Sequence, residues 1–421
     1  MGMLQKIAME NKTGRQIGVF SVCTSNQLVI RAALRHAGKR GYPLVLEATS
    51  NQCNQFGGYT GMTPKDYMDM VHHLVEEEGC PASQLILGGD HLGPLVSCHK
   101  PEREAMKDAA DMIRAYAAAG FGKIHIDTSM RVASDNQNAR LPDSTIARRG
   151  AQLCSVAETA FAEYQAAHPN APKPVYVIGS EVPIPGGAQE NEDSVAVTTS
   201  HDCEQTLAEF ERAFAARGLT DAWTHVIAIV VQPGVEFADE SVIEYKRSAA
   251  AELMASLSSH PGLVFEGHST DYQPRKCLRE MVEDGIAILK VGPALTFALR
   301  EGLFALEQIE RELYAMHDFP LSCFRETLEQ VMLENKGQWA KYYHGDMTQK
   351  RYARAFSFSD RARYYLTNPK VQQSIHRLLE NLDAIGIPVA LLSQYLPAQY
   401  ARVRSGKLLP RAADLLIDRV G

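Results

Sequence analysis

The 421-residue sequence contains no Cys-x-x-Cys pair. Its eight cysteines are scattered along the chain, and no spacing among them is typical of a zinc finger or of a disulfide framework. Cysteines in this pattern are typical of proteins from a reducing compartment, where thiols stay free. We therefore expect a cytoplasmic protein with reduced cysteines.

Long apolar runs are also missing. No stretch approaches the roughly 20 apolar residues that a membrane-spanning helix requires, and residues 1–15 lack the apolar core of a signal peptide. The net charge is −7, so there is no excess of positive charge to attract nucleic acid or an anionic membrane. We expect neither kind of partner, and an anionic ligand would have to be bound by local positive groups.

Two nucleotide-binding motifs are absent. The sequence has no G-x4-G-K-[ST] phosphate loop, which argues against a kinase of that type. A glycine-rich turn is also missing after the first expected strand, because Ser21–Ser25 contains no glycine. A doubly wound dinucleotide-binding sheet usually carries such a turn, so this fold is the less favoured of two alternatives.

Eight short apolar runs alternate with longer segments of helical periodicity. The runs are rich in Val, Ile and Leu and nearly continuous, which is typical of parallel strands buried on both faces. Eight such alternations favour the α/β fold of a (β/α)8 TIM barrel over an open sheet. The predicted strands are Ile17–Cys23, Leu44–Ala48, Leu85–Gly89, Lys123–Asp127, Val175–Ser180, His225–Val231, Leu263–Gly267 and Ala287–Val291. The predicted helices are Lys65–Glu78, Pro101–Ala118, Ala147–Ala167, Cys203–Arg217, Glu240–Leu257 and Arg275–Asp284.

The β signal disappears after about residue 305. We therefore predict a barrel domain over residues 1–305 and a helical C-terminal region over residues 306–421 that packs on the barrel or on a partner. This region is rich in Tyr and Arg, as in Arg361–Tyr365, and such side chains are most often solvated or at interfaces. Its predicted helices are Glu307–Ala315, Cys323–Glu334, Lys370–Ile385 and Ala398–Ser405.

One long loop follows the fifth predicted strand. It runs from Ser180 to Asp202 and is rich in Gly, Pro, Glu and Asn. Loops of this length without structure of their own are often lids or binding loops. We expect this segment to contribute to a binding site.

Chemically able side chains gather at the carboxyl ends of the predicted strands, where barrels of this kind have their active sites. Imidazoles beside a carboxylate, with one position left open, make a divalent-metal site. We predict His91 and His268 as ligands of zinc or a similar ion, with His125 or Glu181 completing the set. The candidate catalytic residues that move protons are Asp90, Asp127 and Glu181.

Each of these residues also has a structural interpretation. A single inward His or carboxylate in a barrel is often a hydrogen-bonded core group, and His125 and Asp127 could simply support the floor of the site. Lys290, on the eighth strand, could be a Schiff-base amine. We favour a salt-bridged lysine there.

The segment Asn51–Gly61 has little apolar content and many hydrogen-bonding groups. Its carboxamides can bind sugar hydroxyls, and its glycines expose backbone N–H groups that can face an anion; an elaborate turn is the structural alternative. A helix that follows Gly292 would offer a second anion site at its N-terminus. The predicted substrate-binding residues are Glu47, Asn51, Gln52, Asn54, Gly58, Gln232, Ser269 and Asp271.

Several of these segments together resemble the GatZ/KbaZ family, the Z subunits of class II D-tagatose-1,6-bisphosphate aldolase. The resemblance rests on EATSNQCNQFGGYTGMTP at Glu47–Pro64, GGDHLGP at Gly88–Pro94, GFGKIHID at Gly120–Asp127, EGHSTDY at Glu266–Tyr272 and KVGP at Lys290–Pro293. It implies a barrel similar to the class II aldolases. It also implies a role in galactitol, tagatose or N-acetylgalactosamine catabolism, as an accessory subunit that stabilises and activates a catalytic Y subunit in an oligomer. Some members are labelled tagatose-6-phosphate kinase, which the missing phosphate loop does not support.

Two hypotheses follow. In the first, the chain is the accessory subunit and its partner does the chemistry. In the second, it is itself a metal-dependent ketose or ketose-phosphate 4-epimerase or aldolase, as some relatives are described. In the class II aldolases an Asp-His pair on a barrel strand supplies a proton-transfer carboxylate and a metal ligand, and Asp90-His91 is similar. The second hypothesis requires breakage of the C3–C4 bond of a ketose, followed by release of both halves or by re-addition to the other face.

Overall fold

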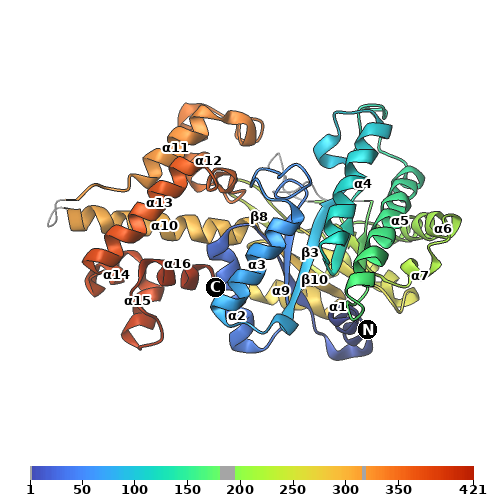
Figure 1. Cartoon of the computed structure of the whole chain (residues 1–421), viewed down its shortest axis with the longest axis horizontal. Coiled ribbons are helices and arrows are strands. Elements are labelled where there is room, and N and C mark those ends of the chain that lie inside the picture. Colours follow the sequence, from blue (N-terminus) through green and yellow to red (C-terminus); the bar gives the residue numbers. More distant parts are fainter. Residues whose placement is uncertain (1, 181–194, 315–318) are drawn as a thin grey trace.

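Eight parallel strands close into a barrel in this computed structural model, which describes residues 2–180, 195–314 and 319–421 (Figure 1). The order around the barrel is β1-β10-β9-β6-β5-β4-β3-β2. The strands are β1 Val19–Cys23, β2 Leu44–Thr49, β3 Leu85–Leu92, β4 Lys123–Ile126, β5 Val175–Ile178, β6 Val226–Val231, β9 Val264–Gly267 and β10 Ile286–Val291. The predicted TIM barrel is confirmed, and each predicted strand overlaps one observed strand.

Helices follow the strands around the outside of the barrel. They are α2 Gln27–Arg40, α3 Pro64–Glu78, α4 Glu102–Ala118, α5 Asp143–Ala167, α6 Ser200–Ala216, α8 Arg247–Ser256, α9 Arg275–Glu283 and α10 Pro293–Tyr314, with the short α7 Thr220–Trp223 before β6. The start of α3 illustrates the local cause. The Thr63 hydroxyl accepts a hydrogen bond from the Asp66 amide, and Pro64 occupies the first turn, where no amide donor is needed.

The segment after β6 differs from the prediction. A helix was expected over Glu240–Leu257, but the chain first forms a two-stranded antiparallel sheet from β7 Glu236–Phe237 and β8 Val242–Ile243. The helix α8 begins only at Arg247. The apolar residues of this stretch pack in the hairpin rather than on a helix face. Periodicity over so short a run does not distinguish a strand from a helix.

The two ends of the barrel differ in polarity. At the amino end, Leu4 and Ile7 of the N-terminal helix α1 (Met3–Glu10) join the apolar interior formed by strand residues such as Val19, Val45 and Val177. This helix therefore closes the lower end with apolar side chains. Charged and imidazole groups fill the opposite end, at the carboxyl termini of the strands.

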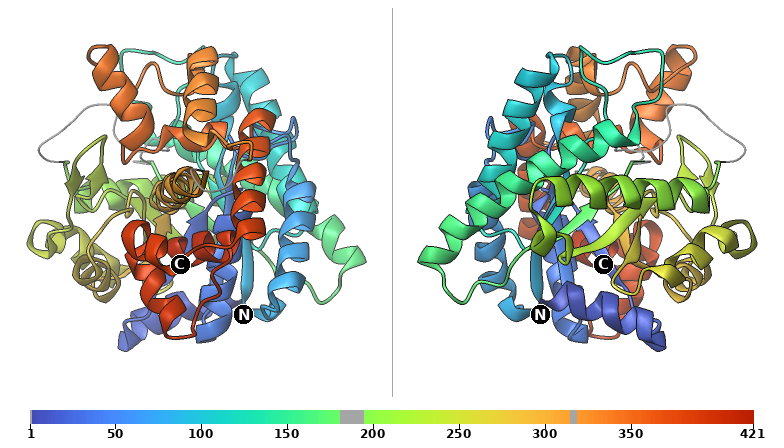
Figure 2. Two further views of the ribbon diagram at one scale, coloured as in Figure 1. Left: turned by 90° about the vertical axis from the view of Figure 1, so that its left-hand side faces the viewer. Right: turned by 90° about the vertical axis from the view of Figure 1, so that its right-hand side faces the viewer.

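The C-terminal region is helical, as predicted. Its helices are α11 Phe324–Glu334, α12 Met347–Phe356, α13 Pro369–Ile385, α14 Val389–Tyr395, α15 Pro397–Arg404 and α16 Ala412–Val420. A short 3-10 helix, η6 (Arg361–Tyr365), lies between α12 and α13. In Figures 1 and 2 these helices form a second lobe along α10, and α16 returns to pack on α2.

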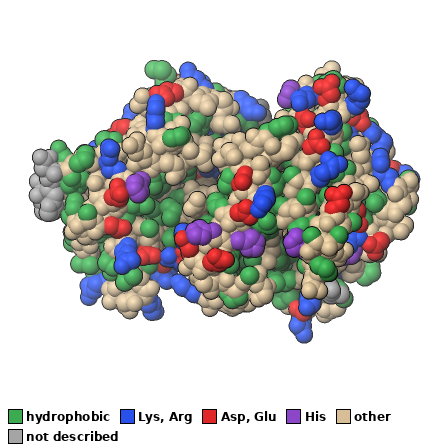
Figure 3. Space-filling model, viewed as in Figure 1, with side chains coloured by type: hydrophobic (Ala, Val, Ile, Leu, Met, Phe, Trp, Pro, Cys, Tyr) green, Lys and Arg blue, Asp and Glu red, His purple; other side chains and the backbone are tan. Residues whose placement is uncertain are grey.

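The predicted boundary at residue 305 falls inside an element. Helix α10 runs without a break from Pro293 to Tyr314, so it belongs to both the barrel and the C-terminal lobe. Among the described residues, no helix is long and apolar enough to cross a bilayer. Figure 3 shows basic and acidic side chains interspersed over one face of the molecule.

Candidate active site

Three histidines meet at the carboxyl end of the barrel. His91 lies near the end of β3, His125 on β4 and His268 just beyond β9. The ring centroids of His91 and His125 are 5.1 Å apart, those of His91 and His268 5.0 Å, and those of His125 and His268 5.2 Å. All three side chains are buried. The structure thus brings together the three histidines that the sequence singled out.

Each histidine is held by a different carboxylate. His91 Nδ1 lies 2.8 Å from Asp127 Oδ2, His125 Nδ1 lies 2.7 Å from Asp90 Oδ1, and His268 Nε2 lies 3.0 Å from Glu266 Oε1. The backbone N–H of His91 also points at His125 Nδ1, at 3.2 Å. We place the His125 proton on Nδ1, because the shorter contact to a carboxylate is the stronger one.

This arrangement leaves one nitrogen of each ring available. They are His91 Nε2, which lies 3.6 Å from Asp90 Oδ2, His125 Nε2 and His268 Nδ1. His125 Nε2 is buried and has no hydrogen-bond partner, although buried polar atoms almost always have one. Histidines that bind a metal usually donate their other N–H to a carboxylate or a carbonyl. The three rings show this pattern, and one possible ligand atom from each of Asp90, His91, His125 and His268 lies within 4.8 Å of the others. The donor set therefore fits a divalent ion.

Burial favours the neutral form of one of these imidazoles, that of His268. Burial lowers the pKa of His268 to about 3, against the opposing effect of Glu266. Burial also acts to lower the pKa of His91, but the carboxylates of Asp90 and Asp127 outweigh it and the net shift is upward. Burial would raise the pKa of Asp127, yet the bond from His91 holds it at about 2. These carboxylates therefore stay ionised and favour positive charge at the histidines.

Two buried lysines lie between the carboxylates. Lys123 on β4 pairs with Glu47 and, at 2.8 Å, with Glu266. Lys290 on β10 pairs with Asp90 and, at 2.6 Å, with Glu47. Burial acts to lower the pKa of Lys290, but Asp90 and Glu47 raise it well above the usual value. A protonated amine cannot form a Schiff base, so the geometry supports the salt-bridged interpretation of Lys290.

The charges in this cluster do not cancel. Four carboxylates (Glu47, Asp90, Asp127 and Glu266) face two ammonium groups, which leaves a formal charge of −2 when the imidazoles are neutral. An uncompensated buried charge is costly. A divalent cation at the three histidines would neutralise it.

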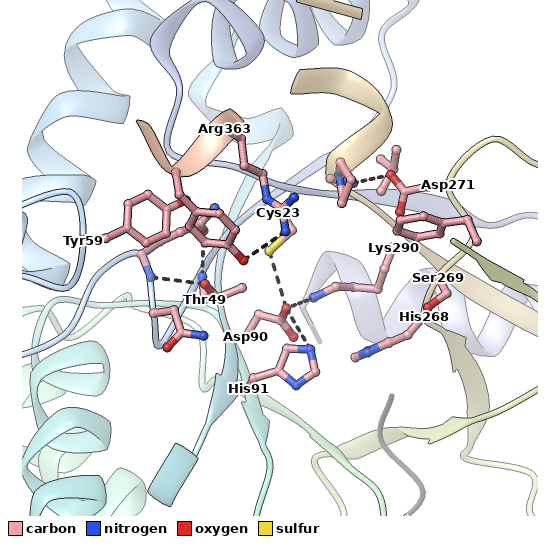
Figure 4. A pocket seen from close by; sticks show the side chains of 17 residues that line it. Cys23, Thr49, Tyr59, Asp90, His91, His268, Ser269, Asp271, Lys290 and Arg363 are labelled. Atoms are coloured by element: carbon pink, nitrogen blue, oxygen red, sulfur yellow. Dashed lines mark hydrogen bonds and ion pairs between the residues drawn. The ribbon is translucent and has the colours of Figure 1, made fainter. Parts of the chain in front are cut away.

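An open pocket lies above the cluster (Figure 4). Asp90, His91, His268 and Lys290 face it from the barrel, and Asn51, Gln52, Ser269 and Asp271 form part of its wall. Two residues near the histidines have left-handed backbone conformations, His91 at φ 49° and Ser269 at φ 53°. Such conformations cost about 1–3 kcal/mol and tend to cluster at active sites.

Other predicted substrate-binding residues have internal partners instead. Glu47 is fully buried under the lysines. Asn54 binds the Ser50 carbonyl and accepts from the amides of Phe56 and Gly58. A Cβ on Gly58, which has φ 56°, would lie 2.3 Å from the Gln52 carbonyl oxygen. Gln232 accepts from the amides of Gly234 and Val235. Asn54, Gly58 and Gln232 shape turns near the pocket, and none of these three residues nor Glu47 is among its lining residues. Glu181, predicted as a catalytic residue, lies outside the described residues, as does most of the predicted binding loop.

The pocket also contains residues that the sequence did not assign. Arg363 and Tyr364 reach it from η6, and Tyr59 and Cys23 also line it, with the Tyr59 ring against that of Tyr364. The Tyr- and Arg-rich run Arg361–Tyr365 was visible in the sequence, but nothing local indicated its position. It lies 70 or more residues beyond β10, and only the packing of the C-terminal lobe brings it over the barrel.

The comparisons with known proteins agree along the whole chain. Residues 4–421 match the family described as D-tagatose-1,6-bisphosphate aldolase subunit GatZ/KbaZ-like. The chain is 46% identical over 417 residues to the D-tagatose-1,6-bisphosphate aldolase subunit GatZ of Salmonella enteritidis PT4 (strain P125109), covering 99% of this chain and 96% of the relative. The GatZ subunit of Salmonella gallinarum (strain 287/91 / NCTC 13346) gives the same identity and coverage.

A solved structure is similar over nearly its full length. It is described as a probable tagatose 6 phosphate kinase from Sinorhizobium meliloti 1021, and it superposes with a TM-score of 0.85 at 44% sequence identity. The alignment covers 96% of this chain and 97% of that one.

Proposed function

The chain belongs to the GatZ/KbaZ-like family, and from this membership and its site we propose that it is a subunit of D-tagatose-1,6-bisphosphate aldolase whose own barrel mouth is a divalent-metal site for ketose chemistry. The observation that carries the proposal is the set of three histidines. Each has one nitrogen on a carboxylate, and one possible ligand atom from each of them, together with one from Asp90, lies within 4.8 Å of the others. A subunit that only stabilised a partner would gain nothing from such a set.

His91, His125 and His268 would hold the ion, and we propose zinc or a similar metal. When bound, such a metal supplies Lewis-acid polarisation of the ketose carbonyl and its neighbouring hydroxyl. Asp127 and Glu266 orient the His91 and His268 rings. The protein therefore contributes a rigid, buried set of donors before any substrate arrives.

Asp90 is the residue placed to move a proton. It lines the pocket, and burial, which would raise its pKa, is outweighed by His91, Lys290 and His125, so that its pKa lies well below the usual value. It therefore enters the reaction as an ionised carboxylate, and its position facing the pocket is what makes it the candidate to accept the proton of the C4 hydroxyl. As that proton leaves, C4 becomes an aldehyde carbon, the C3–C4 bond breaks and its electron pair passes to C3, in conjugation with the C2 carbonyl. Asn51 and Gln52 offer amide groups to the remaining hydroxyls.

The same bond breakage has two outcomes. Release of both halves is the aldolase reaction, and re-addition of C3 to the other face of the aldehyde inverts C4 and gives a 4-epimerase. A family role in galactitol, tagatose or N-acetylgalactosamine catabolism suits either outcome, since both act on ketoses. Phosphoryl transfer is not proposed, because the chain has no phosphate-loop motif and both lysines at the barrel mouth are paired with carboxylates.

The test is the metal content of the purified chain and of His91→Ala and His268→Ala variants. We expect about one ion per wild-type chain, little in either variant, and turnover of a ketose phosphate that is lost with the metal. His73→Ala is the matched control, because its imidazole is 69% exposed on α3. Folded His91→Ala and His268→Ala proteins that keep their metal would contradict the assignment.

A purely accessory role is the second candidate, and it is favoured by the description of the relatives as subunits. In that case a catalytic Y subunit would do the chemistry, and this chain would stabilise and activate it. Addition of a Y subunit to wild-type and His91→Ala proteins separates the two roles. Equal stimulation by both proteins would support the accessory role alone, whereas stimulation by the wild type alone would support a working site.

A further inference from the structure

The usual phosphate position of a barrel is already filled in this protein. Barrels of this type frequently bind phosphate at the N-terminus of a helix that follows the last strands. Here α10 begins directly after β10, but Asp271 Oδ1 accepts from the backbone N–H of Gly292 at 2.9 Å and of Ala294 at 2.8 Å. A carboxylate thus occupies the donors that a phosphate would need, and its charge would repel a second anion.

Lys290 and Arg363 both line the pocket, and they differ in their partners. Lys290 is shared between Glu47 and Asp90. The Arg363 guanidinium, by contrast, donates to the carbonyls of Ser359 and Asp360 and to the hydroxyl of Tyr364, which are uncharged acceptors. The Asp360 carboxylate is taken by Arg300 at 2.8 Å and Thr296 at 2.7 Å. Among the described residues, Arg363 therefore forms no hydrogen bond or ion pair with a carboxylate, and its interactions with Asp360 and Asp271 are electrostatic only.

The surroundings of Arg363 hold it in place and leave donors to spare. Its guanidinium carbon lies 4.4 Å from the centre of the Tyr364 ring, and the rings of Tyr364 and Tyr59 meet edge to face at 5.0 Å. A guanidinium has five N–H donors, and the bonds to Ser359, Asp360 and Tyr364 leave some of them unused. Figure 4 shows the group pointing into the pocket, on the side opposite His91 and His268.

We propose that Arg363 binds the single phosphate group of a ketose monophosphate whose carbonyl end lies at the three histidines. The inference rests on the proposed function for the identity of the carbonyl end. Arginine is suited to this role because its planar fork of donors matches two phosphate oxygens. The C-terminal lobe then does more than pack on the barrel, since it supplies the group that distinguishes phosphorylated from free ketoses.

The test measures binding by calorimetric titration of the full chain with inorganic phosphate, D-fructose 6-phosphate and D-fructose. We expect Arg363→Gln to weaken phosphate and D-fructose 6-phosphate roughly tenfold to a hundredfold, the usual effect of losing hydrogen bonds to a charged group. D-fructose binding should not change. Arg363→Lys keeps the charge and should recover part of the loss, which a purely structural defect would not allow.

Arg351→Gln is the matched control, because Arg351 is an exposed arginine of α12 that does not line the pocket. It should bind every probe as the wild type does. Unchanged phosphate binding in Arg363→Gln, or no phosphate binding by the wild type, would overturn the proposal. So would fructose 1,6-bisphosphate binding tenfold more tightly than the monophosphate. Because inorganic phosphate does not require the metal, this result is independent of the metal assay that tests the proposed function.

Discussion

Lys290 is the residue on which the charge balance of the barrel mouth most depends. Its side chain is 7% exposed, and it pairs with Asp90 and Glu47 on two other strands. Lys290→Met should lower the free energy of unfolding by about 3–5 kcal/mol, because it leaves buried carboxylates without their partner. Urea unfolding of the purified variant measures this change.

Lys65→Met is the control for this substitution. Lys65 forms an ion pair with Asp69 on the surface of α3, where the two side chains are 69% and 56% exposed. Exposed pairs contribute about 0–1 kcal/mol, so the control should unfold nearly as the wild type does. Similar losses in the two variants would mean that the buried network does not stabilise the fold.

At the scale of single elements, the turn after β3 sets the position of Asp127, the carboxylate that contacts His91. Gly93 lies so close to the chain after β4 that a Cβ would be 1.6 Å from the Asp127 carbonyl oxygen. Gly93→Ala should therefore displace Asp127, which holds His91 Nδ1. We expect a loss of about 3 kcal/mol in stability and a roughly tenfold to hundredfold loss in metal affinity, measured by urea unfolding and competition with a chelator.

Gly122→Ala tests whether glycine substitution alone is responsible. Gly122 precedes β4, and the nearest atom to an added Cβ is Ile86 Cγ2 at 3.7 Å, an ordinary contact. This variant should keep its stability to within about 1 kcal/mol and bind metal normally. A Gly93→Ala protein that behaves the same way would show that the turn after β3 can relax.

A second element-scale contact joins α4, α5 and the loop between β4 and α5. The buried Arg149 donates to Asp135 at 2.9 and 2.7 Å and to Glu102 at 2.7 Å. Hydrogen bonds from Arg149 lower the pKa of both Asp135 and Glu102. In the unfolded chain the pKa is about 3.9 for Asp and about 4.3 for Glu. Because the folded pKa values are lower, these contacts stabilise the protein fully above about pH 4.5. That stabilisation is lost as the pH falls through the folded pKa values.

Arg149→Met should remove this contribution. We expect a variant about 3 kcal/mol less stable at pH 7 that loses less further stability than the wild type between pH 5 and pH 3, as followed by urea unfolding across that range. Arg148→Met is the neighbouring control, since Arg148 is 49% exposed and Glu102 is its only ion-pair partner within the part of the chain that the structure describes. It should change stability by less than about 1 kcal/mol. Parallel pH profiles for wild type and Arg149→Met would contradict the argument.

At the scale of the whole molecule, the barrel and the C-terminal lobe share a core. Helix α10 runs through both, and Leu416 of α16 packs on Gly302 of α10. Arg35 of α2 also pairs with Asp414 of α16 at 2.7 Å. We therefore expect one calorimetric unfolding transition for the entire chain rather than two.

Leu416→Ala should move that transition as a unit. Leu416 is fully buried, so its truncation should cost about 2–5 kcal/mol and lower the midpoint without splitting the transition. The side chain of Leu409 is 58% exposed. Leu409→Ala should therefore change the free energy of unfolding by no more than about 0.5 kcal/mol and leave the midpoint nearly unchanged. A separate transition for the C-terminal lobe in Leu416→Ala would show that the two parts are independent.

The barrel and its polar mouth followed from the sequence because their signals are local. Buried parallel strands are continuous apolar runs, and a residue at the end of such a strand must lie at the same rim as the others. That reasoning predicts that His91, His125 and His268 lie together, as the structure shows. It did not indicate that the side chains of Asn54 and Gln232 accept hydrogen bonds within turns, because a carboxamide that binds a sugar and one that holds a turn have the same local sequence pattern.

Only the tertiary structure decided which charges meet. The pairing of Lys290 with Glu47 and Asp90, the capping of α10 by Asp271 and the arrival of Arg363 over the pocket join segments that are distant in sequence. Periodicity and turn chemistry carry no information on such contacts, since they report neighbours within a few residues. The sequence therefore determined the fold class and the gathering of histidines and carboxylates at the mouth, whereas the packing of the C-terminal lobe determined the pocket above it.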